Sequence, residues 1–360
     1  MLPSRSGVPG GVPVHVVPGP RGHGVDLCAR QLAAAVGAEV VATVPDDRRP
    51  VHLHVTDRVW GATPELAAAA VVAVCRTRPT TLTLHDVPQP HDGRALFPRR
   101  SAAYAEMARA AAGVVVSSRH ERGLLRRVLD DAPGPRSPAG PRPTVGVVPL
   151  PAVGRREHTA ADAAHRLAGD SAWRRPGRST LGVAGWVYPG KGHLQAIGAA
   201  AALRRRGLTV DVLALGAVAR GHDADAEELV RRGARCGVEV RISGWLDDAG
   251  LDEALAQVDV PYAGHRNVSA SGSVNSWLSA GRRPLVRRGP YFEEMARLRP
   301  GTLHLVDVAG LPDAVAHALA HPASTRLRPG AALTHDLADA GRGYERFWER
   351  VRGADRGRVA

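Results

Sequence analysis

Lysine is nearly missing from this chain of 360 residues. Of its 48 lysine and arginine residues, only Lys191 is a lysine. Aromatic residues make up 4% of the sequence, so its hydrophobic cores must consist mainly of alanine, valine and leucine. No apolar run approaches the ~20 residues that cross a membrane, and no apolar leader segment opens the chain. We therefore expect a soluble, cytoplasmic protein without a stable membrane anchor.

Cysteine is almost as scarce as lysine. Cys28, Cys75 and Cys236 are far apart and odd in number, and they lack the spacing of metal ligands. This pattern argues against a disulfide framework and against a cysteine-based zinc site. We expect no obligatory metal or other cofactor.

The net charge of +13 is the one feature that favours a nucleic-acid partner. The arginines are spread along the chain, and no basic stretch interleaved with aromatic residues occurs. We interpret the charge as an arginine-rich solvated surface with affinity for small anions. Nucleic-acid binding is kept as a third hypothesis, and we expect no nucleic-acid partner.

One stretch combines a strand, a glycine loop and a helix start. The apolar run at 181–184 predicts a strand buried on both faces, which ends at Gly185. Lys191 follows between two glycines, and the alanine-rich segment 193–204 predicts a helix. Backbone N–H groups and the positive end of the helix dipole favour an anion there, and lysine acts as a point charge on phosphate. His193 occupies the position after the Gly-Lys-Gly, so the Walker pattern is not met. The alternative is a chance lysine in a surface turn.

Strands alternate with helices along the whole chain, which predicts parallel, doubly wound sheets. At 360 residues the chain fits two domains of about 150 residues each. The predicted strands are 12–17, 39–43, 51–55, 80–84, 113–116 and 144–151 in the first domain, and 180–184, 209–215, 238–242, 258–262, 284–286 and 302–306 in the second. Among the helices, we expect one at 101–112 and a last one at 342–352.

Five stretches together resemble a known family: 82–86, 113–118, 145–149, 185–192 and 259–286. The chain resembles the GT-B glycosyltransferases over nearly its whole length, and within them the retaining family-4 enzymes that use nucleotide-sugars. The resemblance implies an α/β fold with GT-B architecture, in which two Rossmann-like doubly wound domains face each other across a cleft. It implies an N-terminal acceptor-side domain (1–153), a linker (154–178) and a C-terminal donor domain (179–335). A C-terminal helix (336–360) would pack back towards the N-terminal domain.

The resemblance also implies a function. Members of the family transfer a sugar, typically a hexose, from a nucleotide-diphosphate donor, so a nucleotide-sugar co-substrate is expected here. The lysine after the glycine loop sits on the donor diphosphate, which implies that role for Lys191. The diphosphate would leave while the acceptor attacks from the same side. The implied donor-binding residues are Gly185, Lys191, Gly192, Gly244, Trp245, Ser269, Ser271, Gly272, Ser273 and Asn275.

The chain departs from the family pattern at three positions. Trp186 replaces the arginine that usually follows the first glycine of the loop, which removes one phosphate cation. Val268 and Ser276 occupy the places of two usual glutamates. Trp245 borders the expected nucleotide base and is interpreted either as a stacking residue or as an indole buried between helices.

Around those missing glutamates the sequence offers a serine-rich helix start. Ser269, Ser271 and the amides of Gly272 and Ser273 would form an anion cradle. A plain N-cap is the alternative role for Ser271. The donor's ribose and sugar must then be held by other groups, such as Asn275, His265 or Arg266.

On the first domain, His85 ends an apolar strand and is followed by Asp86. The resemblance places His85 near the reacting sugar, so both Lys191 and His85 are candidate catalytic residues; a histidine bonded to backbone at a strand end is the alternative. Asp86 and His23 are expected on the acceptor side. His52 and His54 alternate on one strand face and are interpreted as packing or acceptor-side contacts.

Two functions remain open for a chain of this family resemblance. The first is a retaining glycosyltransferase acting on a small soluble acceptor. The second is a degenerate GT-B protein that binds a nucleotide or a partner enzyme without transfer, as the loss of both glutamates would allow.

Overall fold

The computed structural model describes residues 11–19, 24–131, 143–152, 173–266, 268, 270–328, 330–331 and 333–359, with backbone alone from residue 355. The chain divides into two compact units. Unit 1 comprises residues 1–151 and 335–360, and unit 2 comprises residues 152–334. No helix in the described part of the chain has both the length and the apolar character needed to cross a membrane.

Unit 1 contains a parallel sheet of six strands in the order β2-β1-β3-β4-β5-β6. The strands are β1 (Val14–Val16), β2 (Val40–Val41), β3 (Val51–Val55), β4 (Thr80–Leu84), β5 (Gly113–Val116) and β6 (Thr144–Val147). The chain reverses its direction of travel across the sheet between β1 and β3. In doubly wound sheets, ligands bind beyond the carboxyl ends of the strands at such a switch point.

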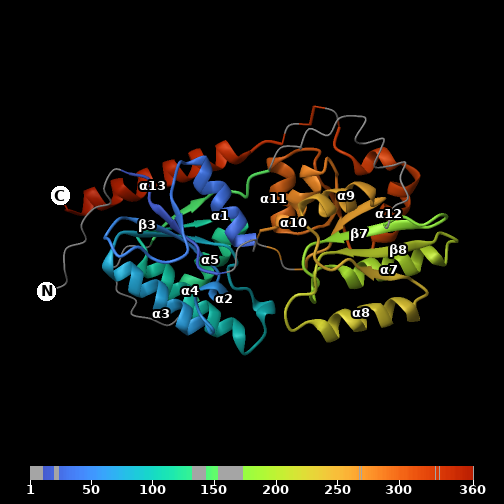
Figure 1. Cartoon of the computed structure of the whole chain (residues 1–360), viewed down its shortest axis with the longest axis horizontal. Coiled ribbons are helices and arrows are strands. Elements are labelled where there is room, and N and C mark those ends of the chain that lie inside the picture. Colours follow the sequence, from blue (N-terminus) through green and yellow to red (C-terminus); the bar gives the residue numbers. More distant parts are fainter. Residues whose placement is uncertain are drawn as a thin grey trace. The chain divides into compact units, whose positions relative to one another are not determined.

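Helices cover both faces of this sheet (Figure 1). The helices α3 (Pro64–Thr77), α4 (Leu96–Ala110) and α5 (Arg119–Asp131) pack on one face, and α1 (Gly24–Ala35) and α13 (Leu337–Val359) pack on the other. The short α2 (Asp57–Trp60) follows β3, and η1 (Pro90–Asp92) precedes α4.

One helix boundary differs from the sequence-based prediction. α4 begins at Leu96 rather than at Ser101, because Pro98 falls in the first turn, where no intrahelical N–H bond is lost. α13 runs from Leu337 to Val359, close to the 336–360 expected for the C-terminal helix and longer than its central stretch 342–352. Its apolar side is buried and consists of Tyr344, Phe347, Trp348 and Val351.

α13 approaches the sheet closely because two strand residues lack side chains. Cβ atoms placed on Gly113 and Gly146 would lie 2.9 Å and 2.8 Å from ring atoms of Phe347. These glycines therefore form a recess for the phenyl ring. The same face carries polar side chains from β1, β3 and β4, among them His15, His52 and Thr83, so α13 covers a polar surface as well as an apolar one.

Unit 2 contains a second parallel six-stranded sheet, in the order β12-β11-β10-β7-β8-β9. The strands are β7 (Ser179–Ala184), β8 (Val210–Leu215), β9 (Val240–Ile242), β10 (Val260–Ala263), β11 (Leu285–Arg287) and β12 (His304–Val306). With β7 counted as the first strand, the order is 3-2-1-4-5-6, that of a dinucleotide-binding Rossmann sheet. Its switch point lies between β7 and β10.

Helices again pack on both faces. The helices α7 (His193–Arg204), α8 (Asp223–Arg235) and α12 (Leu311–Ala320) cover one face, and α9 (Asp248–Gln257), α10 (Gly272–Ser279) and α11 (Pro290–Leu298) cover the other. The short η2 (Pro322–Thr325) follows α12. α10 and the loop that precedes α7 both begin near the switch point, and these two elements build the site described next.

Candidate functional site

The glycine loop after β7 is fixed on both sides. Val187 pairs with Val218, which extends the ladder between β7 and β8 beyond the sheet. On the other side, the amide of Arg266 donates to the carbonyl of Gly190 at 2.9 Å. Gly192 has a φ of +113°, and a Cβ there would lie 2.6 Å from the Cα of Gly264. Only glycine fits, and the loop is held against the chain that leaves β10, at the switch point.

Lys191 is buried in this loop, with 7% of its surface exposed. Its Nζ donates to Ser273 Oγ at 3.3 Å and lies 5.8 Å from the centre of the Tyr188 ring. Burial lowers the pKa of the ammonium to about 8. No carboxylate pairs with Nζ among the described residues. A buried cation held by one hydroxyl is an unfavourable arrangement unless an anion joins it.

The start of α10 lies beside that ammonium. Ser271 Oγ accepts from the amide of Val274 at 3.3 Å, so the N-cap predicted from the sequence is present. The amide of Ser271 donates to the Tyr291 hydroxyl at 3.1 Å, which ties the helix start to α11. Gly272 and Ser273 occupy the first turn, where backbone N–H groups have no intrahelical acceptor. The Lys191 ammonium therefore lies against the first turn of α10 through Ser273 Oγ, and a cation beside a helix N-terminus favours an anion.

Two buried histidines flank Lys191, and the sequence reasoning missed one of them. Neither ring nitrogen of His193 has a hydrogen-bond partner among the described residues, nor has Nδ1 of His265. Burial and the Lys191 ammonium lower the pKa of His193 to about 4. Burial, with Lys191 and His193, holds the pKa of His265 well below its usual range. Both rings are therefore neutral at pH 7 and can act as donors or acceptors to a ligand. The position of His193 directly after Gly192 was the available signal.

Aromatic side chains lie exposed along the same edge of the sheet. Trp245 is 68% exposed and Trp186 is 42% exposed, with ring centres 6.1 Å apart. The alternative of a Trp245 indole buried between helices is therefore wrong. Trp186, Tyr188 and Trp245 are the large aromatic side chains that the described residues expose most. In a chain with few aromatics, this clustering indicates a surface for a flat ring.

Among the other predicted donor residues, Gly185 and Ser273 lie next to Lys191, since a Cβ built on Gly185 would be 3.0 Å from Nζ and 3.6 Å from the Cβ of Ser273. Asn275 lies one turn further into α10. Gly244, with a φ of +73°, directly precedes Trp245. Ser269 lies outside the described residues.

In unit 1, the carboxyl edge carries His85 directly after β4. Its amide donates to the carbonyl of Val55 at 3.0 Å, and its Nε2 lies 2.9 Å from His54 Nδ1. His54 Nε2 in turn lies 3.0 Å from His15 Nδ1. His54 and His15 are fully buried. The backbone hydrogen bond at the strand end, which was the alternative role for His85, is thus present. His85 also belongs to a series of hydrogen-bonded histidine side chains that the sequence did not reveal.

Asp86 does not stand alone on the acceptor side. Its carboxylate accepts from Arg100 Nη2 at 2.7 Å, and its carbonyl accepts from the same nitrogen at 3.2 Å. Arg100 is buried and also pairs with Asp57 at 3.1 Å and Asp92 at 2.5 Å. Asp86 therefore anchors the turn after His85. The other predicted acceptor-side residue, His23, lies outside the described residues.

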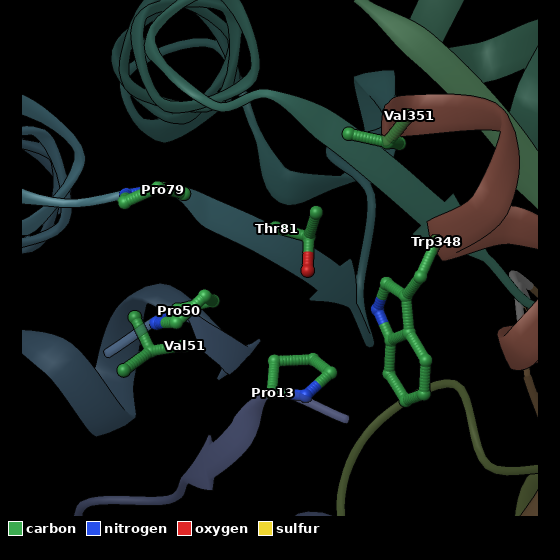
Figure 2. A pocket seen from close by; sticks show the side chains of 7 residues that line it. All are labelled: Pro13, Pro50, Val51, Pro79, Thr81, Trp348 and Val351. Carbon is green, nitrogen blue, oxygen red and sulfur yellow. The ribbon is translucent and has the colours of Figure 1, made fainter. Parts of the chain in front are cut away.

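A hollow wide enough for about one water molecule opens beside His85. Its polar walls come from Cys28, Thr83, Ser117 and Tyr344. A second hollow of similar size lies at the opposite, amino-terminal end of the strands (Figure 2). Figure 2 shows Trp348 and Val351 on α13, facing the strands of Val51 and Thr81. The prolines that line it precede β1, β3 and β4; they are Pro13, Pro50 and Pro79. This second hollow is apolar and lies at the wrong end of a parallel sheet for a ligand site.

The described residues contain no group of three or more His, Cys, Asp or Glu side chains placed to hold a metal ion. On the sheet of unit 1, His15, His54 and His85 are instead hydrogen-bonded to one another, and His52 is hydrogen-bonded to two threonine hydroxyl groups. Their arrangement indicates proton positioning rather than metal binding.

Comparisons of sequence identify no relative: no protein-family description matches the chain, and no curated protein is similar to it. Its fold does match solved structures. HepE from Anabaena, solved with UDP and glucose, has a TM-score of 0.61 at 15% identity, over 96% of this chain and 98% of HepE. The UDP-forming α,α-trehalose-phosphate synthase of Burkholderia vietnamiensis has a TM-score of 0.62 at 17% identity, over 92% of this chain and 74% of that enzyme. The α/β fold with two Rossmann-like sheets is therefore the GT-B fold, as the resemblance predicted.

Proposed function

We propose that this chain is a cytoplasmic glycosyltransferase that moves a sugar from a nucleoside-diphosphate donor to a small soluble acceptor, with retention. The observation that carries the proposal is the buried Lys191 ammonium at the switch point of unit 2. It lies against the first turn of α10, and within the described part of the chain its one hydrogen-bond partner is the hydroxyl of Ser273. A diphosphate supplies the negative charge that this arrangement lacks.

The site suits a leaving group that gains charge. As the bond between sugar and diphosphate breaks, negative charge grows on the phosphate oxygens. Fixed cations and backbone dipoles stabilise that developing charge more than the ground state. Lys191 and the amides of Gly272 and Ser273 would supply this stabilisation without a metal ion.

The nucleoside would lie along the exposed aromatic edge. Trp245 and Trp186 offer flat apolar faces beside the glycine loop, and such faces stack on bases without requiring a particular one. HepE is described in complex with UDP, and the trehalose-phosphate synthase is described as UDP-forming. These neighbours support a nucleoside diphosphate as the ligand class here.

On the acceptor side, we propose that His85 contacts the reacting sugar or the attacking hydroxyl. Asp86 and Arg100 hold the turn that carries it. His23 remains a proposed acceptor-side residue.

One observation favours a second candidate, nucleotide binding without transfer. Where the family has two glutamates, Val268 packs against an apolar cluster and Ser276 Oγ donates to the carbonyl of Gly272 at 3.3 Å. Neither offers a carboxylate to the donor. His265 and Asn275 are the neighbouring groups that would hold the sugar in their place.

The test separates the two candidates. The protein is incubated with UDP-, GDP-, ADP-, TDP- and CDP-sugars, with and without a panel of small sugar acceptors, and released nucleoside diphosphate is measured. Release that depends on both the acceptor and Lys191 supports transfer, and NMR of the product then reports whether the anomeric configuration is retained. Binding of a donor without release supports the second candidate. No binding of any donor contradicts both.

A further inference from the structure

Three adjacent strands bring three histidines into one line. β1 pairs with β3 so that His15 is opposite His52, and β3 pairs with β4 so that His54 is opposite Thr83. His54 is two residues beyond His52 on β3, so it lies nearer the carboxyl edge than His15 does. His85 is one step beyond Thr83. The line runs from the buried face under α13 to the edge where His85 lies.

Hydrogen bonds join these rings head to tail. His15 Nδ1 lies 3.0 Å from His54 Nε2, and His54 Nδ1 lies 2.9 Å from His85 Nε2. We propose that His15, His54 and His85 act as one neutral hydrogen-bonded chain in which His15 and His54 fix the ring orientation and the tautomer of His85. The expected effect on catalysis rests on the proposed function, whereas the hydrogen-bonded series of histidines does not.

The tautomers follow from the inventory of a neutral imidazole, which has one N–H donor and one acceptor nitrogen. Each bond joins Nδ1 of one ring to Nε2 of the next. If His54 accepts at Nδ1, it must donate at Nε2, and the reverse holds equally. All three rings therefore carry their proton on the same kind of nitrogen, either all Nδ1 or all Nε2. A mixed set would leave two donors or two acceptors facing each other.

The surroundings keep His15 and His54, the two buried rings of this histidine chain, neutral. Burial, together with the neighbouring histidines, holds the pKa of His54 well below its usual range, and burial lowers the pKa of His15 to about 4. The titratable groups that face these rings are His52 on β3, Tyr344 on α13 and Cys28 on α1. No carboxylate contributes to the pKa of either ring. The arrangement differs from a catalytic triad, in which an aspartate orients the histidine.

A single tautomer matters because a histidine with its proton on the wrong nitrogen cannot serve as donor or acceptor at the reacting atom. Loss of the orienting group in a triad lowers the rate by about 10⁴ through this effect. His54 would orient His85 without carrying a charge, so a smaller effect on the rate is expected. His54 and His15 are positioning residues, and His85 alone is the candidate for substrate contact.

His52 provides a matched control on the same strand. It is equally buried, but its ring nitrogens bond Thr81 at 2.8 Å and Thr83 at 2.7 Å. Trp348 Nε1, which can only donate, points to His52 Nδ1 at 3.4 Å. His52 is thus held outside the chain.

The chain is tested by long-range ¹H–¹⁵N correlation spectra of the full-length protein labelled at histidine, with each signal assigned from single variants. We expect His15, His54 and His85 to be neutral at pH 7 and to share one tautomer. In His54→Phe, the His85 signals should move to the average of both tautomers. Mixed tautomers in the wild-type chain, an imidazolium within it, or an unchanged His85 signal in His54→Phe would each overturn the proposal. The wild-type spectrum decides even if that variant does not fold.

Kinetics add a readout that a purely structural role would not move. In His54→Phe, kcat should fall by about tenfold or more, with donor Kd within about twofold of wild type. His54→Gln, which keeps one hydrogen bond to His85, should recover part of the rate. His52→Phe should lower the melting temperature by a similar amount and leave the His85 tautomer unchanged. Equal losses of kcat in His52→Phe and His54→Phe would contradict a positioning role. Absence of transferase activity in the wild type would remove only the catalytic consequence, because the spectra stand apart from turnover.

Discussion

The carboxyl edges of the two sheets differ in how completely their buried polar groups are paired. In unit 1, both ring nitrogens of His54 are hydrogen-bonded, and Arg100 pairs with three aspartates, although His15 Nε2 has no partner among the described residues. In unit 2, Lys191 has one hydroxyl partner, and His193 has none among the described residues. Buried polar groups normally find partners within the protein. The contrast supports the proposal that an anionic ligand completes the site in unit 2, whereas the groups of unit 1 are largely paired within the protein.

The same contrast is consistent with a lysine at position 191 in a chain whose other basic residues of this kind are all arginine. Arg282 is buried in unit 2 and donates to the carbonyls of Leu255 and Asp259, each at 2.9 Å. A planar fork suits such fixed acceptors, and Arg100 uses it in the same way. The described residues offer Lys191 no such set of acceptors. A compact ammonium is better matched to a phosphate that arrives and leaves.

The largest expected effect comes from removing the Lys191 ammonium. Lys191→Ala should abolish detectable donor turnover while the protein stays folded, because the diphosphate loses its buried counter-charge. Lys191→Arg should also be impaired, since the guanidinium is larger and planar. Steady-state rates with the best donor, beside circular dichroism, provide the check. If Lys191→Ala is as active as wild type, the glycine loop is only a turn and has no role in donor binding.

The next effect concerns the paired edge. His85→Ala should lower kcat by about 10²–10⁴-fold, as losses of a positioned acid or base commonly do, with a much smaller change in donor Kd. His85→Asn keeps a hydrogen bond but cannot titrate, so it should recover part of the rate if positioning dominates. Both constants are measured for each variant. An unchanged kcat in the alanine variant would make His85 a strand-end residue only.

A third prediction uses the lowered pKa of Lys191. In the empty site the pKa is about 8, and a bound diphosphate raises it because the anion favours the ammonium. Between these two pKa values binding takes up one proton, so Kd should be flat below pH 8 and rise about tenfold per pH unit above it. Titration calorimetry from pH 7 to 9.5 measures this. Lys191→Arg should show no such rise, and a flat wild-type curve would contradict the assignment.

The smallest effect separates two roles at the start of α10. Ser271 caps Val274, and loss of a cap alone costs about 1 kcal/mol of stability. In Ser271→Ala, a roughly tenfold loss of activity with an unchanged melting temperature would indicate a phosphate contact. A lower melting temperature with normal turnover would leave Ser271 as a cap only. Ser276→Ala, on the same helix, is the control.

The sequence predicted most of the fold because the strands are short runs rich in valine, leucine and threonine, bounded by proline, glycine or polar residues. β3, β4 and β5 lie where they were expected, at Val51–Val55, Thr80–Leu84 and Gly113–Val116. The helix boundaries were less certain. Pro98 made the start of α4 hard to predict, whereas the expected C-terminal helix at 336–360 is close to the observed α13.

The site was predictable only where its residues are neighbours in sequence or match a family pattern. Lys191 and the α10 start came together as expected. The hydrogen-bonded series of His15, His54 and His85 was not predicted. It depends on the register of three parallel strands, and that register cannot be inferred from the sequence alone. Arg100 was missed for a similar reason: its partners come from separate loops.

The central claim is that unit 2 binds a nucleoside diphosphate through Lys191, and a thermal-shift comparison of wild type with Lys191→Met tests it most directly. Burial that lowers the pKa of Lys191 from 10.5 to about 8 opposes folding of the charged form below pH 8, by up to about 3 kcal/mol. The empty methionine variant should therefore unfold at or above the wild-type temperature. UDP, GDP, ADP, TDP and CDP are tested in turn. We predict that at least one of them stabilises wild type, by about 2.7 kcal/mol at 100 times its Kd. The same nucleotide should not stabilise Lys191→Met. Equal stabilisation of both proteins by the same nucleotide, or of neither by any, would contradict it.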